Sequence, residues 1–386
     1  MFPPSILEQI PIEAQRLIID LSMRIMEDAI DRISMINGIS RTTDYELYTL
    51  SRIGLSSDTV HKAVQSTLAI TDSEIDRIYD EVIQEGYVKD KRLYDAVGIP
   101  HTPYRDNAPL QQLIEAVKMQ TKTELLNITL TMGFAIEMGG KTVFTPMAQY
   151  FQRTLDNAMM DITSGAFDYN KTVKKVIEEM TRSGVRTVDY ESGWSSRIEV
   201  ATRRAIMTGV TQVTGRITDM NAELIGTDHY EVSWHATARP DHQVWQGRVY
   251  SRKELETVCG LGTGSGLCGW NCYHSYYPFI EGVSKRTYTD KQLDEMNAKE
   301  NTPKKYLGKE YTSYEASQRQ RQFETIMRKQ RQDIKLLEQA GADPEDIQNA
   351  KIKYRKTMRQ YREFSKAVDL PQQRERIYAD GLGRVK

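Results

Sequence analysis

Hydrophobic residues recur at helical spacing along most of the chain. After Pro11, apolar side chains return every three or four positions up to Gly38, which predicts an amphipathic helix over 11–37. Ser57 is expected to open a second helix, and the Thr71–Glu74 pair has the spacing of a capping box that would begin a third. The same period predicts further helices over 109–140, 146–164, 172–183, 195–224, 314–340 and 347–368.

The period changes from helical to two after Gly226. Tyr230, Val232 and Trp234 alternate with polar residues, which predicts a half-buried strand. A short helical turn is expected at Pro240, followed by a second strand over 248–251 and a short polar helix. The chain is therefore predicted to be mainly α with a small α+β domain between a helical N-terminal body and long basic C-terminal helices.

Pro- and Gly-rich breaks divide this pattern into four expected domains. They are an N-terminal helical domain over 1–105, a long-helix domain over 106–226, a small α+β module over 227–310 and a basic helical tail over 311–386. Apolar residues are sparse in the tail. We expect its helices to pack one thin stripe on a neighbour and to lack a core of their own.

The net charge of −1 conceals an asymmetry between the tail and the rest of the chain. Residues 301–386 carry 20 basic and 12 acidic side chains, a charge of +8, whereas residues 1–300 carry −9. A basic tail is suited to an anionic partner such as DNA, although a solvated charged helix has the same composition. Without interleaved aromatics, salt-sensitive DNA binding is expected to be weak. The candidate anion contacts are Lys351, Lys353, Arg355, Lys356 and Arg359.

Two features bear on the compartment in which the chain folds. No apolar run approaches the length needed to span a bilayer, and the first residues lack the basic and apolar regions of a signal peptide. The three cysteines are odd in number and clustered, which favours a reducing compartment over a disulfide framework. We therefore expect no membrane partner and folding in a reducing compartment.

Residues 229–279 gather most of the chemically distinctive side chains. Four of the six histidines, all three cysteines and three of the four tryptophans lie there. The segment 264–269 fits a GxGxxG pattern, but the strand before it and the helix after it that a dinucleotide site needs are not predicted. The repeated glycines are expected to make a loop with several positive φ angles.

Three interpretations of the Cys and His residues stay open. Cys272 and His274 are two apart and, with Asn271 to orient an imidazole, have the residue types of a nucleophilic Cys-His pair, but no protease signature surrounds them. A structural zinc is the second interpretation, and in the third the cysteines are small buried groups while the histidines bond the loop backbone. The candidate metal ligands are His235, His242, Cys268, Cys272 and His274.

The sequence motifs in this block carry a family resemblance. HATARPDHQVWQGRVYS (235–251) and GTGSGLCGWNCYHSYYPF (262–279) resemble the phage minor capsid protein 2 family, and the likeness covers most of the chain, most specifically 185–282. The Arg-x-x-His element, a following glycine and a Cys-containing loop are also similar to the Mu F-like head-morphogenesis domain. The signature residues are Arg239, His242, Trp245, Gln246, Gly247, Trp270, Asn271, Cys272 and His274.

The resemblance implies a structural component of a tailed bacteriophage, without catalytic residues. It implies a place inside the head near the portal, and a role in head assembly, genome packaging or ejection. The implied partners are the portal protein, other capsid or scaffold proteins and packaged double-stranded DNA, with synthesis in the bacterial cytoplasm. The alternative is a phage-delivered enzyme or toxin-like hydrolase that would use the Cys/His-rich 229–279 block.

Overall fold

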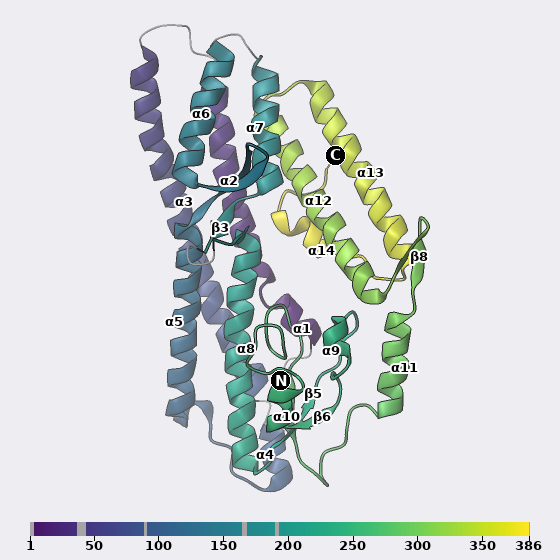
Figure 1. The fold of residues 1–386 in the computed structure, drawn as a ribbon. Coiled ribbons are helices and arrows are strands. Elements are labelled where there is room, and N and C mark those ends of the chain that lie inside the picture. Colours follow the sequence, from purple (N-terminus) through teal and green to yellow (C-terminus); the bar gives the residue numbers. More distant parts are fainter. Residues whose placement is uncertain (1–3, 37–43, 89–90, 164–167, 190–192, 386) are drawn as a thin grey trace.

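The computed structural model describes residues 4–36, 44–88, 91–163, 168–189 and 193–385. Its architecture is mainly helical with three small antiparallel sheets, which confirms the predicted fold class (Figure 1). No helix in these ranges combines the length and apolar character that a membrane crossing requires.

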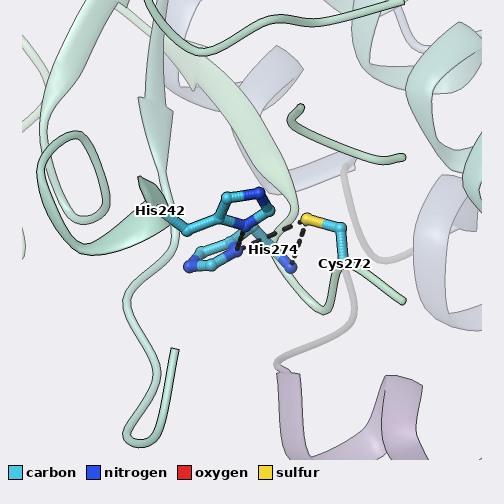
Figure 2. Close-up of side chains that lie close together, drawn as sticks. All are labelled: His242, Cys272 and His274. Atoms are coloured by element: carbon cyan, nitrogen blue, oxygen red, sulfur yellow. Dashed lines mark hydrogen bonds between the residues drawn. The ribbon is translucent and has the colours of Figure 1, made fainter. Parts of the chain in front are cut away.

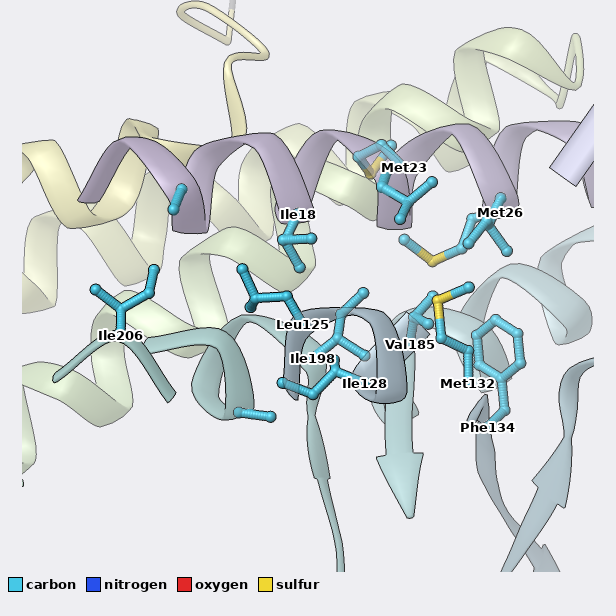
Figure 3. Close-up of a cluster of buried hydrophobic side chains, with 14 of the residues drawn as sticks. Ile18, Met23, Met26, Leu125, Ile128, Met132, Phe134, Val185, Ile198 and Ile206 are labelled. Carbon is cyan, nitrogen blue, oxygen red and sulfur yellow. The ribbon is translucent and has the colours of Figure 1, made fainter. Parts of the chain in front are cut away.

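Long helices form the body of the molecule and enclose the largest core. They are α2 (Ile12–Ile36), α3 (Asp44–Val82), α5 (Ala108–Leu130), α6 (Met147–Thr163), α7 (Tyr169–Ser183) and α8 (Ile198–Ile225). The shorter elements of this region are α1 (Pro4–Gln9), α4 (Lys91–Val97) and the 3-10 turn η2 (Tyr104–Asp106). Ile18, Met23 and Met26 of α2 face Leu125 and Ile128 of α5 across this core (Figure 3).

Helix α2 confirms the prediction for 11–37. The side chains at its predicted apolar positions, among them Ile18, Leu21 and Ile25, are buried, because their spacing places them on the face that packs against the other helices. Gly38, the predicted end of the helix, lies outside the described residues.

The predicted helix starts at Ser57 and Thr71 are wrong. Helix α3 runs without a break through both positions and continues as a π-helix, η1 (Ile83–Val88). Thr71 is buried, and its hydroxyl donates to the Thr67 carbonyl oxygen one turn earlier at 2.7 Å. A hydroxyl bonded back to its own helix does not cap a new one, so the local Thr-x-x-Glu spacing was misleading.

A hairpin replaces the end of the helix predicted over 109–140. Helix α5 ends at Leu130, and strands β1 (Met132–Met138) and β2 (Lys141–Pro146) follow. Gly139 and Gly140 both have positive φ, 56° and 78°, as tight two-residue hairpin turns require. Thr145 pairs with Phe134 in the hairpin, so it does not cap α6, and Gly165 lies outside the described residues.

Strands β3 (Arg186–Val188) and β4 (Ser195–Arg197) complete a sheet of order β2-β1-β3-β4. Residues 195–197 are thus strand where helix was predicted. Helices α7 and α8 are otherwise confirmed: α7 ends before Gly184 at φ 62°, and α8 ends before the left-handed Gly226.

The small α+β module lies against the lower half of α8 in Figure 1. It contains β5 (His229–Val232), α9 (Pro240–Gln243), β6 (Val249–Ser251), α10 (Arg252–Thr257) and β7 (Tyr276–Phe279), with antiparallel strand order β6-β5-β7. Both predicted strands and both short helices are present, although β5 ends at Val232 rather than at Trp234. The core of the module contains Tyr230, Trp245, Leu255, Leu267, Cys272 and Tyr276 among others.

The C-terminal unit, residues 304–385, has a hydrophobic core of its own. The prediction that the tail lacks a core is therefore wrong. Helices α12 (Ser313–Gln339) and α13 (Pro344–Ala367) lie side by side and confirm the two predicted long helices. Between them, Phe323, Met327, Tyr361 and Phe364 are buried. The hairpin of β8 (Lys304–Tyr306) and β9 (Lys309–Tyr311) covers one end, and α14 (Arg374–Ile377) and the 3-10 turn η3 (Tyr378–Asp380) fold back onto the helices.

Two helices link the C-terminal unit to the rest of the molecule. Helix α11 (Asp290–Asn301), which was not predicted, connects the module to the C-terminal unit. Helix α12 belongs to two cores at once: Phe323 and Met327 lie in the C-terminal core, whereas Leu336 and Leu337 lie in the core of the body.

Candidate functional site

The Cys/His block converges on one buried point of the α+β module. Pro240, whose fixed φ suits the first turn of a helix, begins α9, and His242 lies two residues later in the same turn. Cys272 and His274 lie in the loop immediately before β7. The side chains of His242, Cys272 and His274 point toward one another from these two segments (Figure 2).

The three side chains are close enough to share one ligand. Nδ1 of His242 lies 3.4 Å from Nδ1 of His274, and the Cys272 sulfur lies 3.4 Å from the same His274 nitrogen. All the ligand atoms of the group fall within 4.8 Å of one another. Their exposed fractions are 2%, 5% and 1% for His242, Cys272 and His274, so the point is closed to bulk solvent.

The outer nitrogen of each imidazole faces a carbonyl oxygen. His274 Nε2 lies 2.9 Å from Gln246 Oε1, and His242 Nε2 lies 2.9 Å from the Ser265 carbonyl oxygen. Arg239 Nη2 contacts both His242 Nε2 and the Ser265 oxygen. The Trp245 ring packs against both imidazoles, tilted to His242 and edge-on to His274, with centroid distances of 4.5 and 4.8 Å.

Burial sets the protonation of the group. It lowers the pKa of His242 and, more strongly, that of His274, because an imidazolium loses its hydration in this environment. Burial also raises the pKa of the Cys272 thiol. The histidines are therefore neutral near pH 7, and without a cation beside it the thiol stays protonated.

This environment is unfavourable for a nucleophilic cysteine. A reactive thiol needs a lowered pKa and access for its substrate. Cys272 is buried and its pKa is raised, and Asn271, the proposed orienting residue, is exposed at φ 55° in the turn before it. All three cysteines of the chain are free.

The two other candidate ligands lie beside the group but outside it. The His235 ring stacks on the His274 ring at 4.2 Å, while its Nδ1 faces the carbonyl oxygen of Ala236 at 2.9 Å. Cys268 has its sulfur 3.6 Å from the carbonyl oxygen of His274. The structure thus brings together three of the five predicted ligands.

The glycine-rich loop wraps this point and does not form a nucleotide site. A Cβ on Gly266 would lie 2.1 Å from the Gly260 carbonyl oxygen, and one on Gly264 would meet the Trp270 ring at 2.9 Å. In the GxGxxG stretch the glycines therefore permit close approach of the chain, whereas positive φ falls on neighbours such as Gly260 and Cys268. No strand precedes the loop, since α10 does.

Asn297 and Ser265 were not predicted from the sequence, although both bind residues of the signature. Asn297 of α11 accepts from Gln246 Nε2 at 3.3 Å and from Trp234 at 3.2 Å, and the Ser265 carbonyl oxygen fixes His242. Gly247 needs its φ of 75°, and a Cβ there would lie 2.4 Å from Leu293. Asn297 gave no signal because α11 itself was not predicted, and a backbone carbonyl carries no residue signature.

The five predicted basic contacts do not lie on one common surface in the structure. Arg355 and Arg359 line a groove of about 610 Å³ with Arg362, Arg374 and Arg384, and among the residues that the structure describes its lining contains no carboxylate. Lys351 instead pairs with Glu338 at 2.8 Å. Lys353 and Lys356 are exposed on α13 and do not line the groove. The spacing of Arg355, Arg359 and Arg362 along one helix face was the available signal for the third arginine.

The fold and the site define a class: a mainly helical protein whose Cys/His block is a tightly bonded α+β module, with no accessible nucleophile at its centre. Comparison with known proteins identifies the family. The model of the phage minor capsid protein 2 family matches residues 2–366, so the chain belongs to that family.

A curated relative agrees with this assignment. A "Structural protein" of Lactococcus phage LL-H is 23% identical over 284 residues, which cover 69% of this chain and 71% of the relative. No solved structure matches significantly. The family resemblance drawn from the motifs is confirmed, and the chain is a bacteriophage structural protein.

Proposed function

We propose that the chain acts inside the phage head beside the portal, in head assembly, genome packaging or ejection. The observation that carries the proposal is the family match over residues 2–366, which takes in the helical body, the module and most of the C-terminal unit. An assembly role requires surfaces for other head proteins, and the body and the C-terminal unit each offer one.

The first surface is an apolar stripe on α5, defined by Met119, Leu126 and Leu130. Their exposed fractions are 71%, 43% and 70%, and their spacing places them on one side of the helix. Helix α5 lies at the outer edge of the body in Figure 1. Aligned apolar side chains on a solvent-facing helix are suited to a protein contact, and the proposal assigns this stripe to a portal subunit.

An assembly experiment tests this assignment. Phage carrying Met119→Ser/Leu130→Ser should give particles with reduced amounts of the protein, measured by mass spectrometry of purified heads. The matched control is Gln120→Ser/Asn127→Ser, which changes two exposed polar residues of the same helix. Equal incorporation of both variants, or a reconstruction of the head that places the protein away from the portal, would contradict the proposal.

The second surface is the arginine groove beside α13, which we assign to packaged DNA. Five guanidinium groups, with no carboxylate among the described lining residues up to Val385, suit phosphates, and binding through phosphates carries no sequence preference. The groove includes Arg362, Arg374 and Arg384 in addition to two of the originally predicted contacts.

A matched pair of variants separates the groove from general charge. Arg355→Gln/Arg359→Gln and Lys353→Gln/Lys356→Gln each remove two positive charges from α13. In filter binding to duplex DNA, the arginine pair should weaken binding and reduce the salt slope by about 2, since each lost phosphate contact removes about 0.9. Equal effects of the two pairs would show that the groove has no special role.

The alternative, a delivered hydrolase, has less support. Its candidate nucleophile is the buried Cys272 with a raised pKa, and the family and the curated relative are structural proteins. Cys272→Ala particles that assemble normally but fail to infect, together with hydrolytic activity lost from the purified variant, would favour the enzyme.

A further inference from the structure

We propose that His242, Cys272 and His274 bind one zinc ion through Nδ1, Sγ and Nδ1 respectively. The inference rests on the geometry of these side chains and is independent of the proposed role at the portal. It concerns a metal site within the α+β module, at the point drawn in Figure 2.

The distances between the candidate ligand atoms match a shared metal. Zinc bonds of about 2.0–2.1 Å to nitrogen and 2.3 Å to sulfur, with tetrahedral angles, separate two nitrogens by about 3.3 Å and a nitrogen from a sulfur by about 3.6 Å. The observed separations are 3.4 Å between the two Nδ1 atoms and 3.4 Å between His274 Nδ1 and the sulfur. The remaining pair lies within 4.8 Å.

The outer nitrogens have partners that favour unprotonated inner nitrogens. Ser265 and Gln246 present carbonyl oxygens to the outer Nε2 atoms at 2.9 Å, and a carbonyl oxygen only accepts. With these acceptors each imidazole can carry its proton on Nε2, and in that arrangement two Nδ1 lone pairs point at each other. A cation between them satisfies both, and a carbonyl partner on the far nitrogen is the usual arrangement for a metal-bound histidine.

The ligand types favour zinc. Imidazole nitrogen with thiolate sulfur is a common donor set for zinc, and three protein ligands leave a fourth position for a solvent molecule. Binding converts the Cys272 thiol to a thiolate and releases its proton, so the step needs no oxidant or reductant. The cation would also fix the end of α9 to the loop before β7.

A metal-free arrangement competes with this inference. Arg239 Nη2 also contacts His242 Nε2, and a hydrogen bond from it would move the His242 proton to Nδ1, which would then donate to His274 Nδ1. That chain satisfies both imidazoles without an ion. The two arrangements differ in metal content, which makes them separable by experiment.

The first measurement uses the wild-type full chain. Protein purified from cells grown with zinc and dialysed should contain about one zinc per chain by mass spectrometry. Replacement by Co²⁺ should give the visible bands of a tetrahedral site and a near-ultraviolet sulfur-to-metal band. A folded wild-type chain that neither retains zinc nor gives these bands with added Co²⁺ would overturn the proposal.

Variants assign the ligands. Cys272→Ser should lose the sulfur-to-cobalt band and most of the zinc, whereas Cys259→Ser, a buried free cysteine of the same core outside the group, should keep both. Far-ultraviolet circular dichroism checks that each variant folds, and the wild-type spectrum decides the question where Cys272→Ser does not fold. Full zinc retention by folded Cys272→Ser, or equal loss in both variants, would contradict the assignment.

Discussion

The C-terminal unit and the α+β module differ in how they accommodate buried polar side chains. Each is small, and each places polar side chains at its centre. In the C-terminal unit, Arg331 and Asp380 form a buried ion pair with two bonds of 2.7 Å, and their side chains are 1% and 0% exposed. In the module, the Nδ1 atoms of His242 and His274 face each other across 3.4 Å.

The two units differ in whether the buried polar groups balance one another without a bound ion. Arginine and aspartate neutralise each other, so the charge at the centre of the C-terminal unit is balanced within the protein. The zinc proposal requires both imidazoles to carry their protons on Nε2, where each faces a carbonyl oxygen. In that arrangement the Cys272 thiol is the one described protein group that donates to a Nδ1 atom of the pair. We therefore expect the C-terminal unit to respond to loss of a charge partner or to pH, and the module to respond to metal.

The largest effect should come from breaking the ion pair. Arg331→Met leaves Asp380 charged and buried, which costs about 3–5 kcal/mol of unfolding free energy. Urea denaturation followed by circular dichroism measures it. Arg331→Met/Asp380→Asn removes both charges and keeps an acceptor for the Leu382 amide, so it should be clearly more stable than the single variant. A double variant no more stable than Arg331→Met would contradict a self-neutralising pair.

The next effect is a pH dependence in the same unit. Glu324 of α12 is buried, and burial raises its pKa to about 7, against lowering contributions from Tyr361 and nearby arginines. Because the folded pKa lies above the unfolded value, the folded state binds more protons between about pH 4.5 and 7. Stability should therefore fall as pH rises through this window, by at most about 3 kcal/mol.

Glu324→Gln provides the control for this pH dependence. The variant keeps an acceptor for the Tyr361 hydroxyl, which lies 3.1 Å from Glu324 Oε1, but cannot ionise. Unfolding free energies of both proteins at pH 5, 6, 7 and 8 should show a wild-type decline that is flatter in the variant. A difference between the two proteins that stays constant across the range, or changes in the other direction, rules out Glu324 as the source.

The smallest effect is expected in the α+β module and concerns its affinity for zinc. Gln246→Leu removes the acceptor 2.9 Å from His274 Nε2 and should lower zinc affinity about 10–100-fold, measured by competition with a chelator. Gln246→Glu restores an acceptor and should recover most of the affinity. If the leucine variant destabilises the protein equally with and without zinc, Gln246 has a structural role alone and the contrast between the two centres fails.

Prediction from the sequence worked best where apolar spacing decided the structure. Helices α2, α7, α8, α12 and α13 follow their hydrophobic periods. Thr71 was misread because its neighbours resemble a cap, while tertiary packing keeps α3 continuous. The Gly139-Gly140 pair was taken as a helix end although both positive φ angles mark a hairpin. The core of the C-terminal unit depends on residues after 370 folding back, which no local period reveals.

The site was predictable in its parts but not in its arrangement. The Arg-x-x-His and Cys-x-His spacings singled out His242, Cys272 and His274, which the fold brings together. Sequence could not separate them from His235 and Cys268, because that depends on ring orientation and loop path. The four-domain division and the signature as a functional unit remain predictions.

Helix α12 gives the molecule a mechanical property. Ala316, Phe323, Met327 and Ile334 of this helix lie in the C-terminal core, and Leu336 and Leu337, directly after them, lie in the core of the body. A helix clamped in two cores has no hinge between them. Moving the C-terminal unit relative to the body would therefore disturb at least one of the two cores, because one continuous helix belongs to both.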